Sequence, residues 1–284
     1  MVQDKAKDII MSFKDIVRSP EMQILPGQIA FYFVMSIIPI ATLSAAFASY
    51  LSNSFNFVNS IGNVLPPVLT DIFTYLSRDM RFQGAAFVLI FYVLIGSNAP
   101  GSIIIASNIL YEVKQPKYIK LKLKSFVMTL MIVMLLLFVI MIPLFGDIIV
   151  HFAVRLLHIK VLEFYRVFYV ISKALVSFII MYFTIKLLYT YAPSKKINKK
   201  TTIRGSLFTT IGWIFATYVY SFYITNIASY DAVYGNFANV LILLLWVYLL
   251  AYLFVIGMAL NVDSYHKQRM CVDEKSKEKK DEEE

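Results

Sequence analysis

An asparagine and a proline lie close together near the middle of a long apolar stretch, in the segment Gly96-Ser97-Asn98-Ala99-Pro100. Pro100 has no backbone N–H and crowds the carbonyl group four residues earlier, so a helix through this segment would carry unpaired backbone groups. Asn98 needs a hydrogen-bond partner in the same dry surroundings. Two interpretations fit: a proline kink packed by small neighbours, or a broken helix that aims polar groups at a bound molecule.

Lys173 is a second polar group inside an apolar stretch. A charged side chain in such a position is costly unless it faces water or the interior of a helix bundle. Lys173 lies about two turns from the outer end of its stretch, so its ammonium could snorkel to the membrane interface. The alternative is an ammonium that faces a cavity, where it would suit an anionic headgroup or a phosphate.

Polar side chains also stand at the ends of apolar stretches, beside lysine-rich segments. They could form a polar gate on the cytoplasmic side. They could equally cap helix ends and bond between neighbouring helices, which is the favoured interpretation. The candidates are Asn108, Tyr111, Arg204 and Asn261.

Tyr230 and Tyr234 flank a short segment before Gly235 that is expected to lie on the outer face. They could line the mouth of a substrate path. Tyrosines also gather at membrane interfaces as an aromatic belt, and this interpretation is favoured.

The sequence offers little for catalysis. Asp147, His151 and His158 fall roughly on one helical face, but the chain has no H-E-x-x-H pattern, so a solvated outer surface is favoured over zinc. No G-x-S-x-G or Walker A motif is present either, and none of the three histidines lies within an apolar stretch. We therefore predict that the chain is not an enzyme and uses no metal or other cofactor.

The elements that must position these residues are helices. A membrane-spanning helix needs about 20 apolar residues, and six stretches qualify. We predict an all-α bundle of six transmembrane helices over residues 28–50, 84–107, 126–149, 167–190, 205–228 and 238–261. Small residues on the fifth stretch, among them Gly205, Gly212 and Ala216, predict close helix packing there.

Positive charge alternates along the segments that join these stretches. Twenty lysines and arginines fall in the first, third, fifth and last segments, and five fall in the segments between them. Cytoplasmic loops of membrane proteins carry the excess of positive charge. Both termini are therefore expected in the cytoplasm.

Residues 1–22 predict an amphipathic helix that ends at Pro20 and Pro26 and that either lies in the membrane interface or docks against the helix bundle. The tail, 265–284, is highly charged and has little to bury, so disorder is expected there. Its Cys271 is the sole cysteine of the chain, which excludes an internal disulfide.

The composition fits a membrane protein better than a nucleic-acid-binding protein. Of the 284 residues, 59% are hydrophobic and only 16% are charged. The net charge of +9 lies in short segments beside the apolar stretches, where it would face anionic lipid. No segment forms a folded basic module, so nucleic acid is not an expected partner.

Four groups of residues occur in an order that resembles the YihY/BrkB family of bacterial inner-membrane proteins, long mislabelled as a ribonuclease. The chain departs from the family at Ala259, where many members carry an acid, so a role of that acid cannot transfer. The resemblance implies a six-helix membrane protein, with links in some members to lipid export and serum resistance. The four groups are Ala30-Phe31-Tyr32 with Ser36 and Pro39; Asn108 with Tyr111; Tyr191-Ala192-Pro193 with Arg204, Gly205 and Trp213; and Tyr234-Gly235 with Trp246, Tyr248, Gly257 and Asn261.

We expect a multi-pass protein of the bacterial cytoplasmic membrane that handles a lipid or other amphipathic envelope molecule, as a transporter, flippase or accessory. Its partners would be membrane lipids. The alternative is a scaffold without transport activity that organises proteins of envelope biogenesis. An intramembrane enzyme has the least support.

Overall fold

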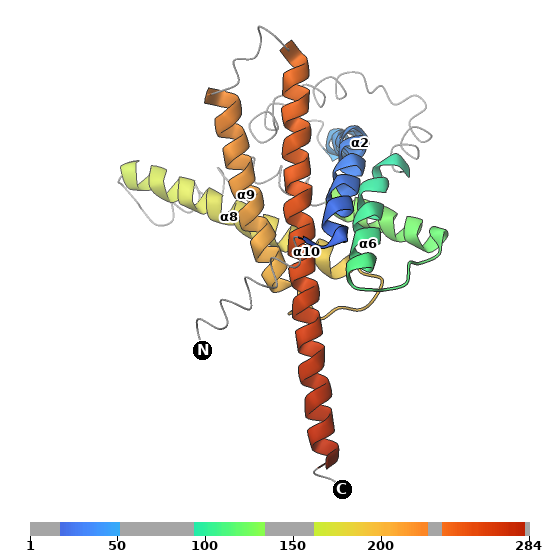
Figure 1. Cartoon of the computed structure of the whole chain (residues 1–284). Coiled ribbons are helices and arrows are strands. Elements are labelled where there is room, and N and C mark those ends of the chain that lie inside the picture. The colour runs from blue at the N-terminus through green and yellow to red at the C-terminus, as the bar shows by residue number, and fades with distance from the viewer. Residues whose placement is uncertain (1–17, 52–93, 134–161, 227–234, 282–284) are drawn as a thin grey trace. The chain divides into compact units, whose positions relative to one another are not determined.

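The computed structural model describes residues 18–51, 94–133, 162–226 and 235–281 (Figure 1). Regular secondary structure in these ranges is helical throughout, as the sequence predicts. The labelled helices are α2 (Pro20–Leu51), α6 (Asn98–Leu110), α8 (Leu162–Tyr191), α9 (Ile203–Asn226) and α10 (Gly235–Asp281), and a further helix covers 118–133.

Three helices within the described part of the chain are long and apolar enough to cross a membrane. Their apolar segments are Ala174–Tyr191, Ile203–Asn226 and Val240–Met270, and a shorter apolar helix covers Leu94–Leu110. They fall within or next to four of the six predicted spans. The predicted interfacial helix before Pro20 and much of the spans at 84–107 and 126–149 lie outside the described residues.

Helix α9 is polar on its inner side and apolar on its outer side. Its buried residues are small or hydroxylated: Gly205, Ser206, Thr209, Thr210 and Ala216. Large apolar or aromatic side chains recur at spacings of three and four on the exposed side, namely Ile211, Phe215, Tyr218 and Phe222. This inverted pattern is typical of a helix that faces lipid outwards and packs closely inwards, and it confirms the small-residue packing face predicted from the sequence.

Helix α2 corrects the predicted boundary between the interfacial helix and the first span. Pro20 and Pro26 were expected to end the interfacial helix. A bend at Ser19 does precede Pro20, but α2 starts at Pro20 and runs through Pro26 to Leu51. Pro20 is the first residue of α2, where its missing N–H has no intrahelical partner to lose. Pro26 removes one backbone hydrogen bond, which a membrane helix tolerates when neighbouring groups take up the freed carbonyl.

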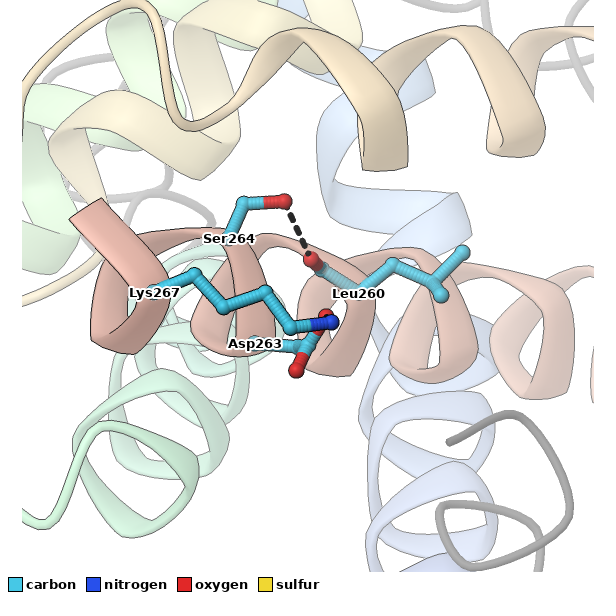
Figure 2. A network of polar contacts seen from close by, with 4 residues as sticks. All are labelled: Leu260, Asp263, Ser264 and Lys267. Carbon is cyan, nitrogen blue, oxygen red and sulfur yellow. Dashed lines mark hydrogen bonds and ion pairs between the residues drawn. The ribbon is translucent and has the colours of Figure 1, made fainter. Parts of the chain in front are cut away.

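Helix α10 differs from the prediction at its end. It has 47 residues and continues to Asp281, so residues 265–281 form its last turns where disorder was expected. Lys267 pairs with Asp263 at 2.8 Å, and the Ser264 hydroxyl donates to the Leu260 carbonyl at 2.9 Å (Figure 2). Such contacts between residues four apart stabilise an exposed helix, and the alternating acids and bases of the tail permit more of them.

The chain forms two compact units. One contains Met1–Val34, Gly101–Leu121 and Ile185–Glu284, and the other contains Met35–Pro100 and Lys122–Thr184. Each unit holds one of the polar clusters described below.

Candidate functional site

The apolar helix over Leu94–Leu110 is interrupted beside Asn98 by a turn at one residue. A helical turn at 94–96 is followed by a turn at Ser97, and α6 then starts at Asn98. Pro100 is therefore in the first turn of α6, where the absence of its N–H costs little. Both interpretations from the sequence, a packed proline kink and a break that presents polar groups to a bound molecule, fit this interruption.

Side chains donate hydrogen bonds to backbone carbonyl groups next to the turn. The Ser97 hydroxyl donates to the Leu94 carbonyl at 2.8 Å, and the Lys122 ammonium donates to the same oxygen at 3.0 Å. The hydroxyl of Ser36, a fully buried residue of α2, donates to the Ile95 carbonyl at 3.4 Å. Backbone groups at the break are thus held by side chains from two other helices, which fixes its shape.

Lys122 also meets Asn98 at the break. Its ammonium donates to the Asn98 side-chain oxygen at 2.8 Å. Both acceptors of Lys122 are neutral oxygens, and no carboxylate among the described residues forms an ion pair with it. Burial lowers the pKa of the Lys122 ammonium, because the charged form loses hydration that neutral acceptors restore only in part. We define the helix-break site as Leu94, Ser97, Asn98 and Lys122.

The sequence did not single out Lys122. It was counted among the basic residues of a cytoplasmic segment, which explains its charge but not its contact with Asn98. One signal was present: residues 113–133 contain five lysines and no acid. A lysine at the start of an apolar stretch with no acid nearby has to find acceptors elsewhere in the fold.

Lys124 lies two residues further along the helix at 118–133 and is partly buried, which lowers the pKa of its ammonium to about 8. We expect Lys124→Met to raise the melting temperature at pH 7, because the folded protein then no longer holds a poorly hydrated charge. The pKa in the folded state lies below the ordinary 10.5. The penalty therefore applies in full below about pH 8 and disappears as the pH rises towards 10.5.

Thermal unfolding in detergent at pH 7, 8.5 and 10 measures this effect. The gain from Lys124→Met should shrink over the series, whereas Lys120→Met, at an exposed position of the same helix, should show no such trend. A gain that is constant with pH would contradict the assignment.

The second polar cluster joins α6 to the segment before α9. The side chain of Asn108 is fully buried. Its amide nitrogen donates to Gln115 at 3.0 Å and to the Ser194 hydroxyl at 2.9 Å, and its oxygen accepts from the Ser194 backbone N–H at 2.7 Å. Asn108 therefore bonds between distant segments, as the favoured interpretation of the sequence had it.

Helices α9 and α10 cross through two glycines. A Cβ atom at Gly205 would collide with the Gly257 carbonyl oxygen, and one at Gly257 would lie 2.9 Å from the Gly205 oxygen. The Asn261 side-chain oxygen accepts from the Gly205 backbone N–H at 2.8 Å. Nearby, the Tyr189 hydroxyl shares a hydrogen bond with Thr209 at 2.7 Å.

The candidates for a cytoplasmic gate do not all meet. Asn261 bonds the backbone of Gly205, whereas the neighbouring Arg204 is exposed. Tyr111 packs edge-on against Tyr265 with ring centroids 5.7 Å apart, and its buried hydroxyl has no partner among the described residues. Three of the four candidates, Asn108, Tyr111 and Asn261, are therefore buried, and Arg204 is exposed.

The remaining candidates lie outside what the structure describes. Lys173 belongs to α8, but the placement of its side chain is not described, and Tyr230 and Tyr234 fall in the gap before α10. The same holds for His151 and His158. Their suggested roles remain predictions.

Comparisons with known proteins agree with the membrane character of the helices. A family described as Virulence factor BrkB matches residues 19–284. The Bacillus subtilis protein named putative ribonuclease-like protein YfkH is 28% identical over 260 residues, covering 89% of this chain and 94% of that protein. A UPF0761 membrane protein of Psychromonas ingrahamii is 29% identical over 98 residues, 34% of each chain. A UPF0761 membrane protein of Haemophilus influenzae is 32% identical over 72 residues, 25% of this chain and 27% of that protein. No solved structure matches the chain.

Proposed function

Because the chain belongs to the Virulence factor BrkB family and is a membrane protein, we propose that it handles a lipid or other amphipathic envelope molecule at the helix-break site. The proposal includes six spans with both termini in the cytoplasm, which the alternation of positive charge supports. The protein would act in the bacterial cytoplasmic membrane as a transporter, flippase or accessory.

One observation carries this proposal: a partly buried ammonium, Lys122, is bonded to neutral oxygens at a broken helix. Broken membrane helices are used by transporters to present backbone and side-chain groups to polar parts of a substrate. A polar headgroup that reached Lys122 would compete with Leu94 and Asn98 for its N–H groups. Binding would then weaken the contact between the break and the helix at 118–133. The two segments could then shift relative to each other when the headgroup binds.

Lipid translocation in proteoliposomes tests the proposal. The full-length protein is reconstituted with a fluorescent phospholipid, and the rate at which the label becomes accessible to an added quencher is measured. We expect Lys122→Ala to slow this rate about tenfold or more, the effect of losing one charge-assisted hydrogen bond. Lys120→Ala should leave it near that of the wild type, because Lys120 is exposed.

Lys173→Ala belongs in the same assay, since an ammonium in the fourth span would serve the same path. Equal rates for the Lys120 and Lys122 variants, or a wild-type protein that moves no lipid, would contradict the proposal.

The length of α10 favours a second candidate, a scaffold for proteins of envelope biogenesis. Its charged last turns, from Tyr265 to Asp281, extend beyond the predicted sixth span as a continuous helix. Such a helix offers a surface to a soluble partner without any transport step. A protein that binds partners through this helix but moves no lipid would fit the scaffold.

A further inference from the structure

Within the proposed function, the helix-break site points to one class of ligand. We infer that Lys122 and Asn98 bind the phosphate group of an acidic phospholipid from the cytoplasmic leaflet. The inference rests on the proposed lipid-handling role and adds the headgroup chemistry. Four features of the site carry it: its charge, its free donors, its acceptors and its apolar flank.

Among the described residues, the charge around the site is positive. Residues 113–133 contain five lysines and no aspartate or glutamate. The described residues place no carboxylate within ion-pair distance of Lys122. A partly buried charge without a counter-ion is costly, so an anion gains more at this position than at an exposed lysine.

Donors remain available at the site. An ammonium group has three N–H donors, and two of those on Lys122 are directed at the Leu94 carbonyl and the Asn98 oxygen. The Asn98 side-chain oxygen is bonded to Lys122, and its amide group carries two further N–H donors. A phosphate oxygen placed beside both groups would accept from the ammonium and from the amide.

The acceptors now bonded to Lys122 are replaceable. Leu94 keeps the Ser97 hydroxyl as a donor at 2.8 Å if Lys122 turns away. Hydrogen bonds between an ammonium and a phosphate are stronger than those to a neutral amide oxygen. Exchange of a neutral acceptor for an anionic one is therefore favourable and leaves the break intact.

An apolar flank beside Lys122 favours a lipid over free phosphate. The exposed side chains next along the same helix are Leu123, Phe126, Val127 and Leu130, and Leu123 is 66% exposed. They recur at spacings of three and four, which places them along one side of the helix. A phospholipid with its phosphate at Lys122 could lay its acyl chains along this side, whereas inorganic phosphate would gain nothing from it.

Binding to the purified full-length protein in mild detergent tests the inference. Three probes are titrated: short-chain phosphatidylglycerol, phosphatidylcholine of the same chain length, and inorganic phosphate. Binding is followed by native mass spectrometry and calorimetry. We expect phosphatidylglycerol to bind more tightly than either of the other probes, because only it combines a net negative headgroup with acyl chains.

Matched variants locate the site. Lys122→Gln should weaken phosphatidylglycerol binding about tenfold or more, as expected for the loss of a charge-assisted hydrogen bond. Lys122→Arg keeps the charge and should retain most of the affinity. Lys120→Gln removes the same charge from an exposed position and should have little effect. Size-exclusion profiles show whether each variant is folded.

Two outcomes would overturn the inference. Equal losses for the Lys120 and Lys122 variants would indicate a diffuse basic surface, and inorganic phosphate binding as tightly as phosphatidylglycerol would indicate a soluble anion. The translocation assay separates this inference from the proposed function. Translocation without any preference for acidic lipid would contradict the inference but not the proposed function. Binding that depends on Lys122, without translocation, would contradict the proposed function but not the inference.

Discussion

Replacing Gly257 with alanine should remove most of the folded protein from the membrane. A Cβ atom at this position would collide with the Thr209 hydroxyl, lie 2.6 Å from the Tyr189 hydroxyl and lie 2.9 Å from the Gly205 carbonyl oxygen. A side chain can turn away, but a backbone oxygen can move only if α9 and α10 separate. Overpacking of a core ordinarily costs about 1–3 kcal/mol, and we expect a cost near or above the upper end of that range here.

Gly205→Ala should be equally severe. Its Cβ atom would collide with the Gly257 carbonyl oxygen and lie 2.5 Å from the side-chain oxygen of Asn261. The same substitution would therefore disturb the hydrogen bond from the Gly205 N–H to Asn261. Loss of this bond leaves a buried acceptor unpaired, which adds a cost of about 1–3 kcal/mol.

Two other glycines provide controls. Nothing lies within 4 Å of a Cβ atom at Gly27, in the interior of α2, so Gly27→Ala should be neutral or stabilising by up to about 1 kcal/mol. A Cβ atom at Gly212 would lie 3.2 Å from the end of the Leu253 side chain, which can move, so Gly212→Ala should have a small effect. Membrane yield and melting temperature in detergent measure all four variants. A stable Gly257→Ala protein would refute the close crossing.

The second large effect is expected for Asn108→Asp. The Asn108 amide nitrogen donates to Gln115 and to the Ser194 hydroxyl, so an aspartate would present a carboxylate oxygen to two groups that now accept. The Ser194 hydroxyl can reverse its bond, but the site is fully buried. An unpaired buried charge costs about 3 kcal/mol or more, and we expect a loss of that size at pH 8.

The loss should depend on pH. Burial raises the pKa of a carboxyl group above its unfolded value of about 3.9, so the neutral form is favoured in the folded protein. The variant should therefore lose stability as the pH rises from the unfolded pKa through the folded pKa. Melting temperatures at pH 5 and pH 8, each relative to the wild type, measure this difference.

Asn198→Asp is the matched control. Asn198 is exposed in the segment before α9, and its oxygen accepts from the Lys200 backbone N–H at 3.1 Å, a role that aspartate can keep. Its amide nitrogen also donates to Gln268 at 3.4 Å, a long bond at an exposed position whose loss should cost little. This control should unfold like the wild type at both pH values. An Asn108→Asp protein that is as stable as the control at pH 8 would show that Asn108 is not held as described.

The sequence predicted the elements better than their contacts. Apolar length was sufficient to identify the helices that can cross a membrane, and the small residues of α9 correctly indicated its packing face. Pro26 misled because a break in local bonding was taken for the end of a helix, whereas α2 continues through it. The prediction of a disordered tail was wrong because low hydrophobicity indicates only that a segment buries little. Such a segment can still extend an existing helix, as residues 265–281 do in α10.

The polar clusters show the same limit. Asn98 and Pro100 identified the helix break, but its partner Lys122 is 24 positions away from Asn98. A contact at that separation depends on how the chain returns after α6, which no local pattern encodes. Asn261 and Arg204 were both candidates for a gate, yet Asn261 bonds the backbone of Gly205, whereas the side chain of Arg204 is exposed.

The glycine crossing has a mechanical consequence for α10. Gly257 stands 22 residues after the start of this helix and 24 residues before its end, which are arms of about 33 Å and 36 Å at 1.5 Å per residue. A stiff rod held near its midpoint behaves as a balanced lever. A tilt of α10 that moves one end would move the other end by a similar distance in the opposite direction. Displacements near Gly235 and near Asp281 would therefore be coupled without any rearrangement inside the helix.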